Sequence, residues 1–299
     1  MKRSFYYIGM VFFLFACKSS EVVRGERNEV EACNTPNFAF QGGEKLTYKL
    51  FYNVSAVWIA AGEVSFEVED IGSQFHITAK GRTYESYDKI FKVNDTYETY
   101  LDKKTMLPLT SVREVHEGNY NLYDKVSFNQ KEHTAVSMRG NSKEDATKSE
   151  YSVETCMHDI VSIIYFSRNI DFKNLTKGSY FPLSIFMDKQ AHPLQVLYKG
   201  AEAKVKVKGL GKFDTQIFSP QTVSGKTFKE NTAIDVWVSD DENRLPLIIE
   251  TPISVGYVKA VLYNFMIGKE APPKSSPEGR TYQEVANIRL LEFSFCKKI

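Results

Sequence analysis

The feature that most constrains how this chain can fold is the alternation of apolar and polar side chains along successive residues. A period of two with one polar face is typical of antiparallel strands that pack on one side. The segments that show this alternation are residues 45–52, 63–69, 75–80 and 255–265. In segment 255–265 apolar side chains occupy both faces, which predicts a strand covered on both sides. The sequence therefore predicts a mainly β body.

One segment has a helical period instead. Its apolar side chains recur at the spacing of a single helical stripe, which predicts an amphipathic helix over about 156–168 that lies on the sheet. Thr155 is the expected N-cap, and Asp159 would lie in the first turn, where the helix dipole favours a carboxylate. The stripe consists of Met157, Ile160, Val161, Ile164 and Tyr165.

Two segments, 97–115 and 234–250, share one order: a strand, a charged turn, Leu-Pro and a second strand. Proline suits the first position of a strand, where no ladder N–H is needed. Two interpretations stay open, namely two ordinary hairpins or two similar β halves, 37–150 and 170–299, on either side of the helix. We expect residues 37–299 to form a strongly curved antiparallel sheet or half-barrel with one packed helix. A two-sheet β-sandwich is the alternative.

The N-terminus has the parts of a secretory signal: Lys2 and Arg3, an apolar run over 5–15, and Ala16 before Cys17. As a helix the run would be about 16 Å long, too short for a hydrocarbon core of about 30 Å. Residues 14–17 resemble the bacterial lipobox, in which the cysteine receives a lipid. This predicts a signal peptide over 1–16 and a lipidated stalk over 17–36. The alternative is plain signal cleavage that leaves a free cysteine.

Residue 18 is lysine rather than aspartate, and in this the chain resembles the outer-membrane class of Gram-negative lipoproteins. We therefore expect an exported protein held at the outer membrane by its lipid, with its body in the periplasm or at the surface. A membrane is the expected partner through this anchor.

Three cysteines, Cys33, Cys156 and Cys296, are left once Cys17 carries lipid. The periplasm and cell surface are oxidising, so one pair is expected to form a disulfide. We favour Cys33–Cys156, because this bond would fix the stalk to the body. Sequence alone leaves the connectivity open.

Charge and motifs exclude several classes of function. The chain has 38 basic and 37 acidic side chains, so no excess of positive charge points to nucleic acid. No nucleophile elbow, zinc-protease, Walker or Cys-x-x-Cys motif occurs. We expect no metal, no cofactor and no catalytic residue. A hydrolase with dispersed carboxylates, such as Asp240 with Asp241 or Glu67 with Glu69, is the least favoured interpretation.

Four aromatic residues are candidates for contact with an apolar ligand on the concave face: Trp58, Tyr48, Tyr52 and Trp237. Trp58 belongs to an apolar run over 56–61, where a polar turn is expected. Core packing is the alternative for these side chains. Lys204, Lys206 and Lys208 alternate along one strand, either to protect a sheet edge or to contact lipid phosphates or acidic polysaccharide.

Five segments carry a resemblance to a known family: 43–48, 61–62, 159–168, 236–241 and 244–246. Together they resemble a bacterial family of exported proteins known as domain of unknown function 3108. The resemblance spans about 37–265 and implies a fold and an exported address, but no catalytic residue. The Leu-Pro hairpins also resemble those of periplasmic lipoprotein carriers, whose half-barrels hold acyl chains.

From these features we expect a non-catalytic envelope lipoprotein that binds a lipid, an acyl chain or another apolar or amphiphilic ligand. The alternative is a structural or assembly partner of another envelope protein or of a glycan.

Overall fold

The structure is a computed structural model, and it describes most of the expected β body. The signal peptide and Cys17 lie outside the described residues, as do most of the stalk, Ala56 and Cys296. The described residues are 33, 35–54, 57–87, 92–172, 175–220, 234–252 and 256–267.

The described residues form fourteen strands, which belong to one antiparallel sheet. Neighbours along the sheet follow the order β8-β7-β6-β5-β4-β3-β2-β1-β14-β13-β12-β11-β10-β9. The strands are β1 (Lys45–Val54), β2 (Val57–Asp70), β3 (Gln74–Thr83), β4 (Asn94–Asp102), β5 (Pro108–Glu117), β6 (Tyr120–Asn129), β7 (Thr134–Gly140), β8 (Thr147–Ser152), β9 (Tyr180–Met187), β10 (Gln190–Val207), β11 (Gly211–Pro220), β12 (Asp235–Ser239), β13 (Pro246–Pro252) and β14 (Tyr257–Met266).

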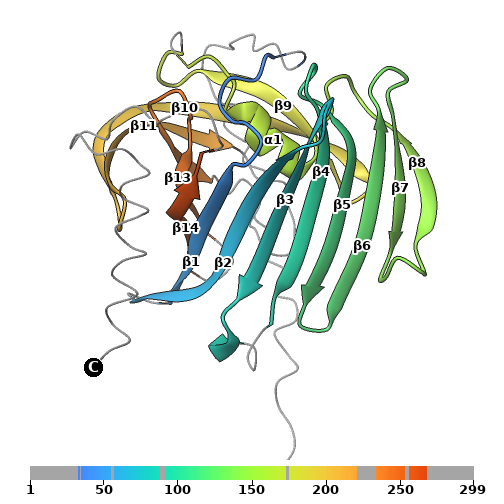
Figure 1. Cartoon of the computed structure of the whole chain (residues 1–299), viewed down its shortest axis with the longest axis horizontal. Helices are drawn as coiled ribbons and strands as arrows, with labels where there is room; N and C mark the ends of the chain where they lie inside the picture. Colours follow the sequence, from blue (N-terminus) through green and yellow to red (C-terminus); the bar gives the residue numbers. More distant parts are fainter. Residues whose placement is uncertain are drawn as a thin grey trace, which may run out of the picture.

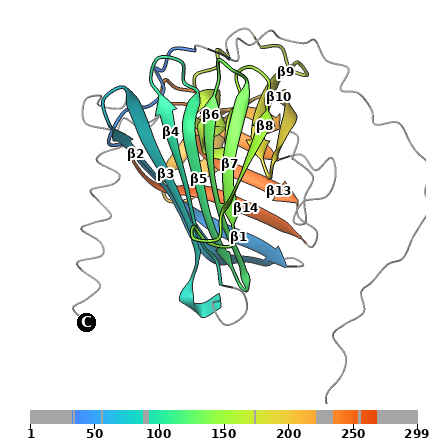
Figure 2. The same cartoon turned by 90° about the vertical axis from the view of Figure 1, so that its right-hand side faces the viewer.

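This order consists of two meanders, β1–β8 and β9–β14, joined side by side where β1 pairs with β14. The outer strands of the sheet are β8 and β9, so the sheet does not close into a barrel. It curls around the helix, with β1–β8 on one side and β9–β11 arching across the other (Figure 1). Figure 2 shows β5–β8 in front of β13, β14 and β1. The predicted curved sheet with one packed helix is confirmed, and the two-sheet sandwich is not what the chain forms.

The helix α1 (Ile160–Ser167) is shorter at its N-terminus than the predicted 156–168. Its N-cap is Asp159, not Thr155, and the Asp159 carboxylate accepts hydrogen bonds from the backbone N–H groups of Val161 and Ser162. The helix cannot start earlier because the backbone of His158 pairs with β9: its N–H donates to Ser184 O, and its carbonyl accepts from Phe186 N.

The main core lies between α1 and the inner face of the sheet. Val161, Tyr165 and Phe166 of the helix are buried against side chains from both meanders. From the first meander come Ile77 and Leu101, each with no exposed surface. The helix therefore supplies the apolar filling around which the sheet curls.

The two Leu-Pro turns have the same local geometry in their last residues. Leu107 and Leu245 are both buried. The residue before each leucine has a positive φ, 58° at Met106 and 46° at Arg244. In both hairpins the strand register shifts next to the proline. The sequence repeat thus corresponds to two similar turns, one in each meander.

Candidate ligand-binding site

A cavity of about 160 Å³ lies between α1 and the inner face of β9–β13; we call it the helix cavity. Its wall is almost entirely apolar, with Ser167 and Arg168 as the polar exceptions. The lining residues are Ile163, Ile164, Ser167, Arg168, Phe172, Phe181, Leu183, Leu194, Val196, Phe218, Pro220, Val236, Val238, Pro246 and Ile249.

Alternation along the strands explains how these residues come together. Successive side chains of a strand point to opposite faces, so pairs two residues apart share the inner face. Leu183 follows Phe181 in β9, and the same spacing relates Val196 to Leu194 in β10. The helix completes the wall with its partly buried face rather than with the fully buried Tyr165 and Phe166. An apolar wall of this kind favours a hydrocarbon group over water.

Arg168, the charged residue in the cavity wall, has its guanidinium bound to other groups of the protein. Its guanidinium binds both carboxylate oxygens of Glu44, at 2.7 and 2.8 Å, and also donates to the carbonyls of Ala39 and Asn243. Arg168 is 2% exposed and Glu44 is 0% exposed. Burial acts to lower the pKa of Arg168, but the Glu44 carboxylate raises it above its usual value. Arg168 therefore stays charged, with the Glu44 carboxylate as its partner.

Three of the segments that carry the family resemblance meet at or beside this ion pair: 43–48, 159–168 and 244–246. Glu44 comes from the loop before β1, Arg168 from the end of α1 and Asn243 from the turn before β13. Beside them, the Tyr48 hydroxyl donates to the carbonyl of Pro246 at 2.8 Å. Asn243 itself lies between two of the segments. Together these residues hold α1 against the junction of the two meanders.

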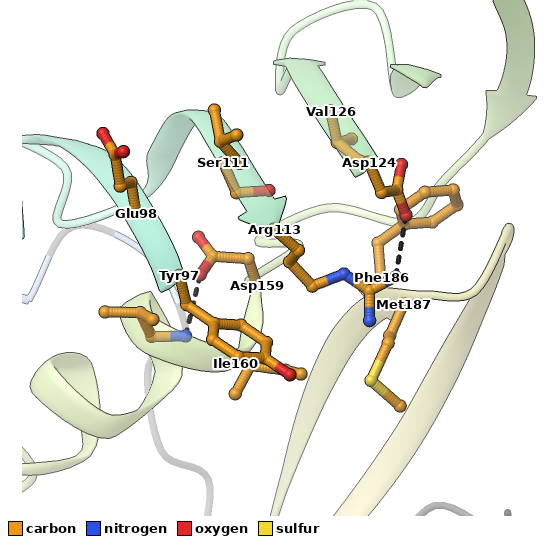
Figure 3. A pocket seen from close by; sticks show the side chains of 12 residues that line it. Tyr97, Glu98, Ser111, Arg113, Asp124, Val126, Asp159, Ile160, Phe186 and Met187 are labelled. Atoms are coloured by element: carbon orange, nitrogen blue, oxygen red, sulfur yellow. Dashed lines mark hydrogen bonds and ion pairs between the residues drawn. The ribbon is translucent and has the colours of Figure 1, made fainter. Parts of the chain in front are cut away.

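A second, polar cleft lies on the other side of α1, against β4–β6 (Figure 3). Its volume of about 10 Å³ is room for about one water molecule. Asp159 at its base accepts a 2.7 Å hydrogen bond from the Thr99 hydroxyl, and burial raises the pKa of this carboxyl. Burial also raises the pKa of Tyr97, at the cleft wall, to about 12.

The charges beside the polar cleft balance one another. Arg113 and Arg139 each contact both Asp124 and Asp188, at 2.7–2.9 Å. Figure 3 shows Arg113 pointing towards Asp124. Asp188 belongs to the turn between β9 and β10, so the four side chains connect the second meander to β5–β7. We assign this cleft a structural role.

None of the four predicted aromatic ligand contacts lines the helix cavity. Tyr48 is buried in a separate core cluster with Phe213 and Leu262. Trp237 faces away from its cavity-lining neighbours Val236 and Val238, and its indole N–H donates to Glu202.

The other two aromatic candidates lie in the β1–β2 hairpin. Trp58 is 39% exposed, with Lys259 Nζ 4.7 Å from its ring centroid. Tyr52 is half-buried in β1, opposite Ile59 and Val258.

The three lysines Lys204, Lys206 and Lys208 are exposed. β9 covers β10 only along Gln190–Leu197, so within the described residues the later part of β10 has one open edge. Lysines on such an edge discourage pairing with another sheet. Lys206 lies opposite Lys212 of β11.

The structure joins Cys33 and Cys156 by a disulfide, with their Cα atoms 5.4 Å apart. This separation is usual for such bonds. Cys156 lies three residues before the N-cap of α1, so the bond connects the segment before β1 to the start of the helix.

The part of the chain that the structure describes contains no group of three His, Cys, Asp or Glu side chains placed to hold a metal ion. Nor does this part contain a helix long and apolar enough to cross a membrane.

The sequence marked the inner faces of the strands but not the helix cavity itself. In the sequence only alternation marks Val236 and Val238. The same holds for Phe181 and Leu183, whose strand is not among the segments predicted above. Their spacing shows which face they share, whereas the gap left between that face and α1 depends on packing across the fold.

A solved structure agrees with this architecture. The fold is similar to the crystal structure of a β-barrel-like protein of domain of unknown function 1849 from Brucella abortus, with a TM-score of 0.54 and 8% identity over 77% of this chain and 99% of that one. A candidate lipoprotein from Parabacteroides distasonis gives a TM-score of 0.28 and 12% identity over the same shares. No curated protein matches the sequence. The model of the family described as "Protein of unknown function (DUF3108)" matches residues 47–263, so the chain belongs to that family.

Proposed function

We propose that this protein is an envelope lipoprotein that binds one apolar chain of a lipid or other amphiphile in the helix cavity. The observation that carries the proposal is the apolar wall that α1 and β9–β13 build around about 160 Å³ of space. Burial of apolar surface is favourable by about 25 cal/mol per Å², so a hydrocarbon chain is the kind of group that binds most favourably against this wall.

The cavity volume sets the size of the bound part. An apolar cavity of about 150 Å³ binds benzene, so the helix cavity has room for about six carbon atoms. Pockets that enclose a whole drug-sized ligand measure about 300–1,000 Å³. We therefore propose that the cavity receives the end segment of a chain, and that the rest of the amphiphile extends out of it.

Filling the cavity tests the proposal. Val236→Phe places a ring in the wall, so we expect the affinity for dodecan-1-ol to fall at least about tenfold, the effect of losing about 1.4 kcal/mol. Val64→Phe is the matched control, because Val64 is a half-buried valine of β2 outside the cavity wall. Titration calorimetry on the full mature chain measures both. A folded Val236→Phe protein that binds dodecan-1-ol as well as the wild type would contradict the proposal.

Native mass spectrometry of protein from its own envelope is the complementary measurement. We expect co-purified lipid in the wild type and less of it in Val236→Phe. A lipid-free protein that carries one stoichiometric protein partner would favour the second candidate below.

The address is tested at Cys17. We propose that Cys17 is lipidated and holds the body at the outer membrane, because a multi-acyl anchor retains a protein far better than one chain does. Cys17→Ser should release the protein from the membrane fraction, and the intact mass of the wild type should show loss of 1–16 and added acyl groups. A Cys17→Ser protein that is processed and still membrane-bound would argue against lipidation.

One observation favours a second candidate function, as an assembly partner in the envelope. Trp58 and Tyr257 are exposed by 39% and 47%. They lie close together, because Asn53 of β1 pairs with both Trp58 and Tyr257. An exposed apolar group of this kind suits contact with another protein.

A further inference from the structure

Arg244 lies between the molecular surface and the helix cavity. Its guanidinium carbon is 4.5 Å from the ring centroid of Phe38 and 4.4 Å from that of Phe172. Phe38 is 52% exposed, whereas Phe172 belongs to the cavity wall. A cation stacked on both rings thus stands where an amphiphile in the cavity would have its polar end.

Toward the residues that the structure describes, the guanidinium of Arg244 donates hydrogen bonds through one nitrogen, Nη1. Nη1 donates to the carbonyls of Arg168, at 3.2 Å, and Ile170. Among the described residues, no carboxylate oxygen lies within 4.0 Å of the guanidinium. The stacked rings cover faces of the guanidinium, so its Nε and Nη2 edge keeps the planar donor geometry that suits a carboxylate or phosphate.

The charge of Arg244 is not fully compensated by its surroundings. Burial lowers the pKa of the guanidinium, and the more distant carboxylates of Asp171, Asp240 and Asp241 raise it by less. Arg168, the neighbouring cation, has a bidentate carboxylate partner at less than 3 Å. The two arginines near the end of α1 therefore differ: among the described residues, Arg168 has a carboxylate in contact with its guanidinium and Arg244 does not.

The first Leu-Pro turn shows which kind of side chain is sufficient at the residue before Leu-Pro. Met106 has the same place before Leu-Pro as Arg244, has the same positive φ, and is completely buried in the core. An apolar side chain is therefore sufficient for such a turn. A cation at the equivalent place in the turn next to the helix cavity calls for a role beyond the turn.

We propose that Arg244 binds the anionic headgroup, a carboxylate or a phosphate, of an amphiphile whose chain occupies the helix cavity. This inference rests on the proposed function and adds the ligand class: anionic rather than neutral amphiphiles. Arg244 is then a binding residue that selects the headgroup, whereas the cavity wall selects the chain.

The experiment compares two ligands with one chain and different heads, dodecanoate and dodecan-1-ol, by titration calorimetry on the full mature chain. The wild type should prefer dodecanoate. Arg244→Met, which copies the side chain of the first turn, should weaken dodecanoate binding at least about tenfold, in line with the strength of a charge-assisted hydrogen bond. Binding of dodecan-1-ol should change less than about threefold. Arg82→Met, an exposed arginine of β3, is the matched control and should change neither.

If Arg244→Met weakens the binding of both ligands equally, the inference is overturned, because Arg244 would then only support α1 and would not recognise the headgroup. If the wild type binds both ligands equally, the headgroup site fails while the cavity function stands. If the wild type binds neither ligand, both proposals fail.

Two further arms use the wild type alone, so they do not depend on the folding of a variant. Rising salt should weaken dodecanoate binding and leave dodecan-1-ol binding unchanged, and equal salt dependence would overturn the inference. Dodecyl phosphate should bind far better than inorganic phosphate. Equal affinity of these two would show a site for free anions and would also overturn it.

Discussion

Arg168→Ala is expected to lower the free energy of unfolding by about 3–5 kcal/mol, the usual cost of removing one partner of a buried ion pair. The cost is large because Glu44, with 0% exposure, would be left as a buried charge. The backbone carbonyls of Ala39 and Asn243 would lose their donor as well. Denaturant unfolding followed by circular dichroism measures the change, as a shift in the midpoint at constant slope.

A matched control separates burial from charge. Arg82 forms an ion pair with Glu63 through a side chain that is 68% exposed, so Arg82→Ala should leave the unfolding midpoint unchanged. The double variant Arg168→Met with Glu44→Leu removes both buried charges and should recover much of the stability lost in Arg168→Ala. An Arg168→Ala protein with the wild-type midpoint would show that the buried pair is not what holds α1 to the sheet.

The second large effect is expected from the disulfide. Replacing Cys33 and Cys156 together by serine should lower the free energy of unfolding by about 2–5 kcal/mol, because a long loop gains entropy in the unfolded chain. The two residues are 123 positions apart in sequence. Unfolding curves of the oxidised wild type and the double variant give the difference.

Cys296→Ser is the control for the disulfide, because the bond does not include Cys296. It should unfold like the wild type. Peptide mapping without reduction should recover residues 33 and 156 in one linked species. Two free thiols at these positions in protein folded in the periplasm would rule out the bond.

Local patterns in the sequence carried most of the fold. Alternation over 45–52, 63–69 and 75–80 marks strands that the structure contains as β1, β2 and β3. The helical stripe identified α1 but extended it too far towards the N-terminus, because Met157 fits the stripe although the backbone beside it pairs with β9. Such pairing brings together residues far apart in the chain, and periodicity carries no information about it.

The site was less predictable than the fold, for the same reason. Large aromatic side chains such as Trp58 and Trp237 were predicted as ligand contacts. The cavity wall instead consists mainly of aliphatic residues on strands of the second meander. The pairing of Glu44 with Arg168 spans 124 positions. The family resemblance contained both residues, but only the fold shows that they touch.

The strand order has a consequence for biosynthesis. β1 is the first strand of the sheet in the chain, and one of its edges is covered only by β14, the last described strand. During synthesis the N-terminal part of the chain emerges first, so the strands of the first meander can pair with one another early. The other edge of β1 stays unpaired until more than 200 further residues have been made, because its partner β14 lies at residues 257–266. Contacts of such separation form slowly, and an open edge invites aggregation in the meantime. Folding of this protein therefore has a vulnerable interval that ends only when β14 docks.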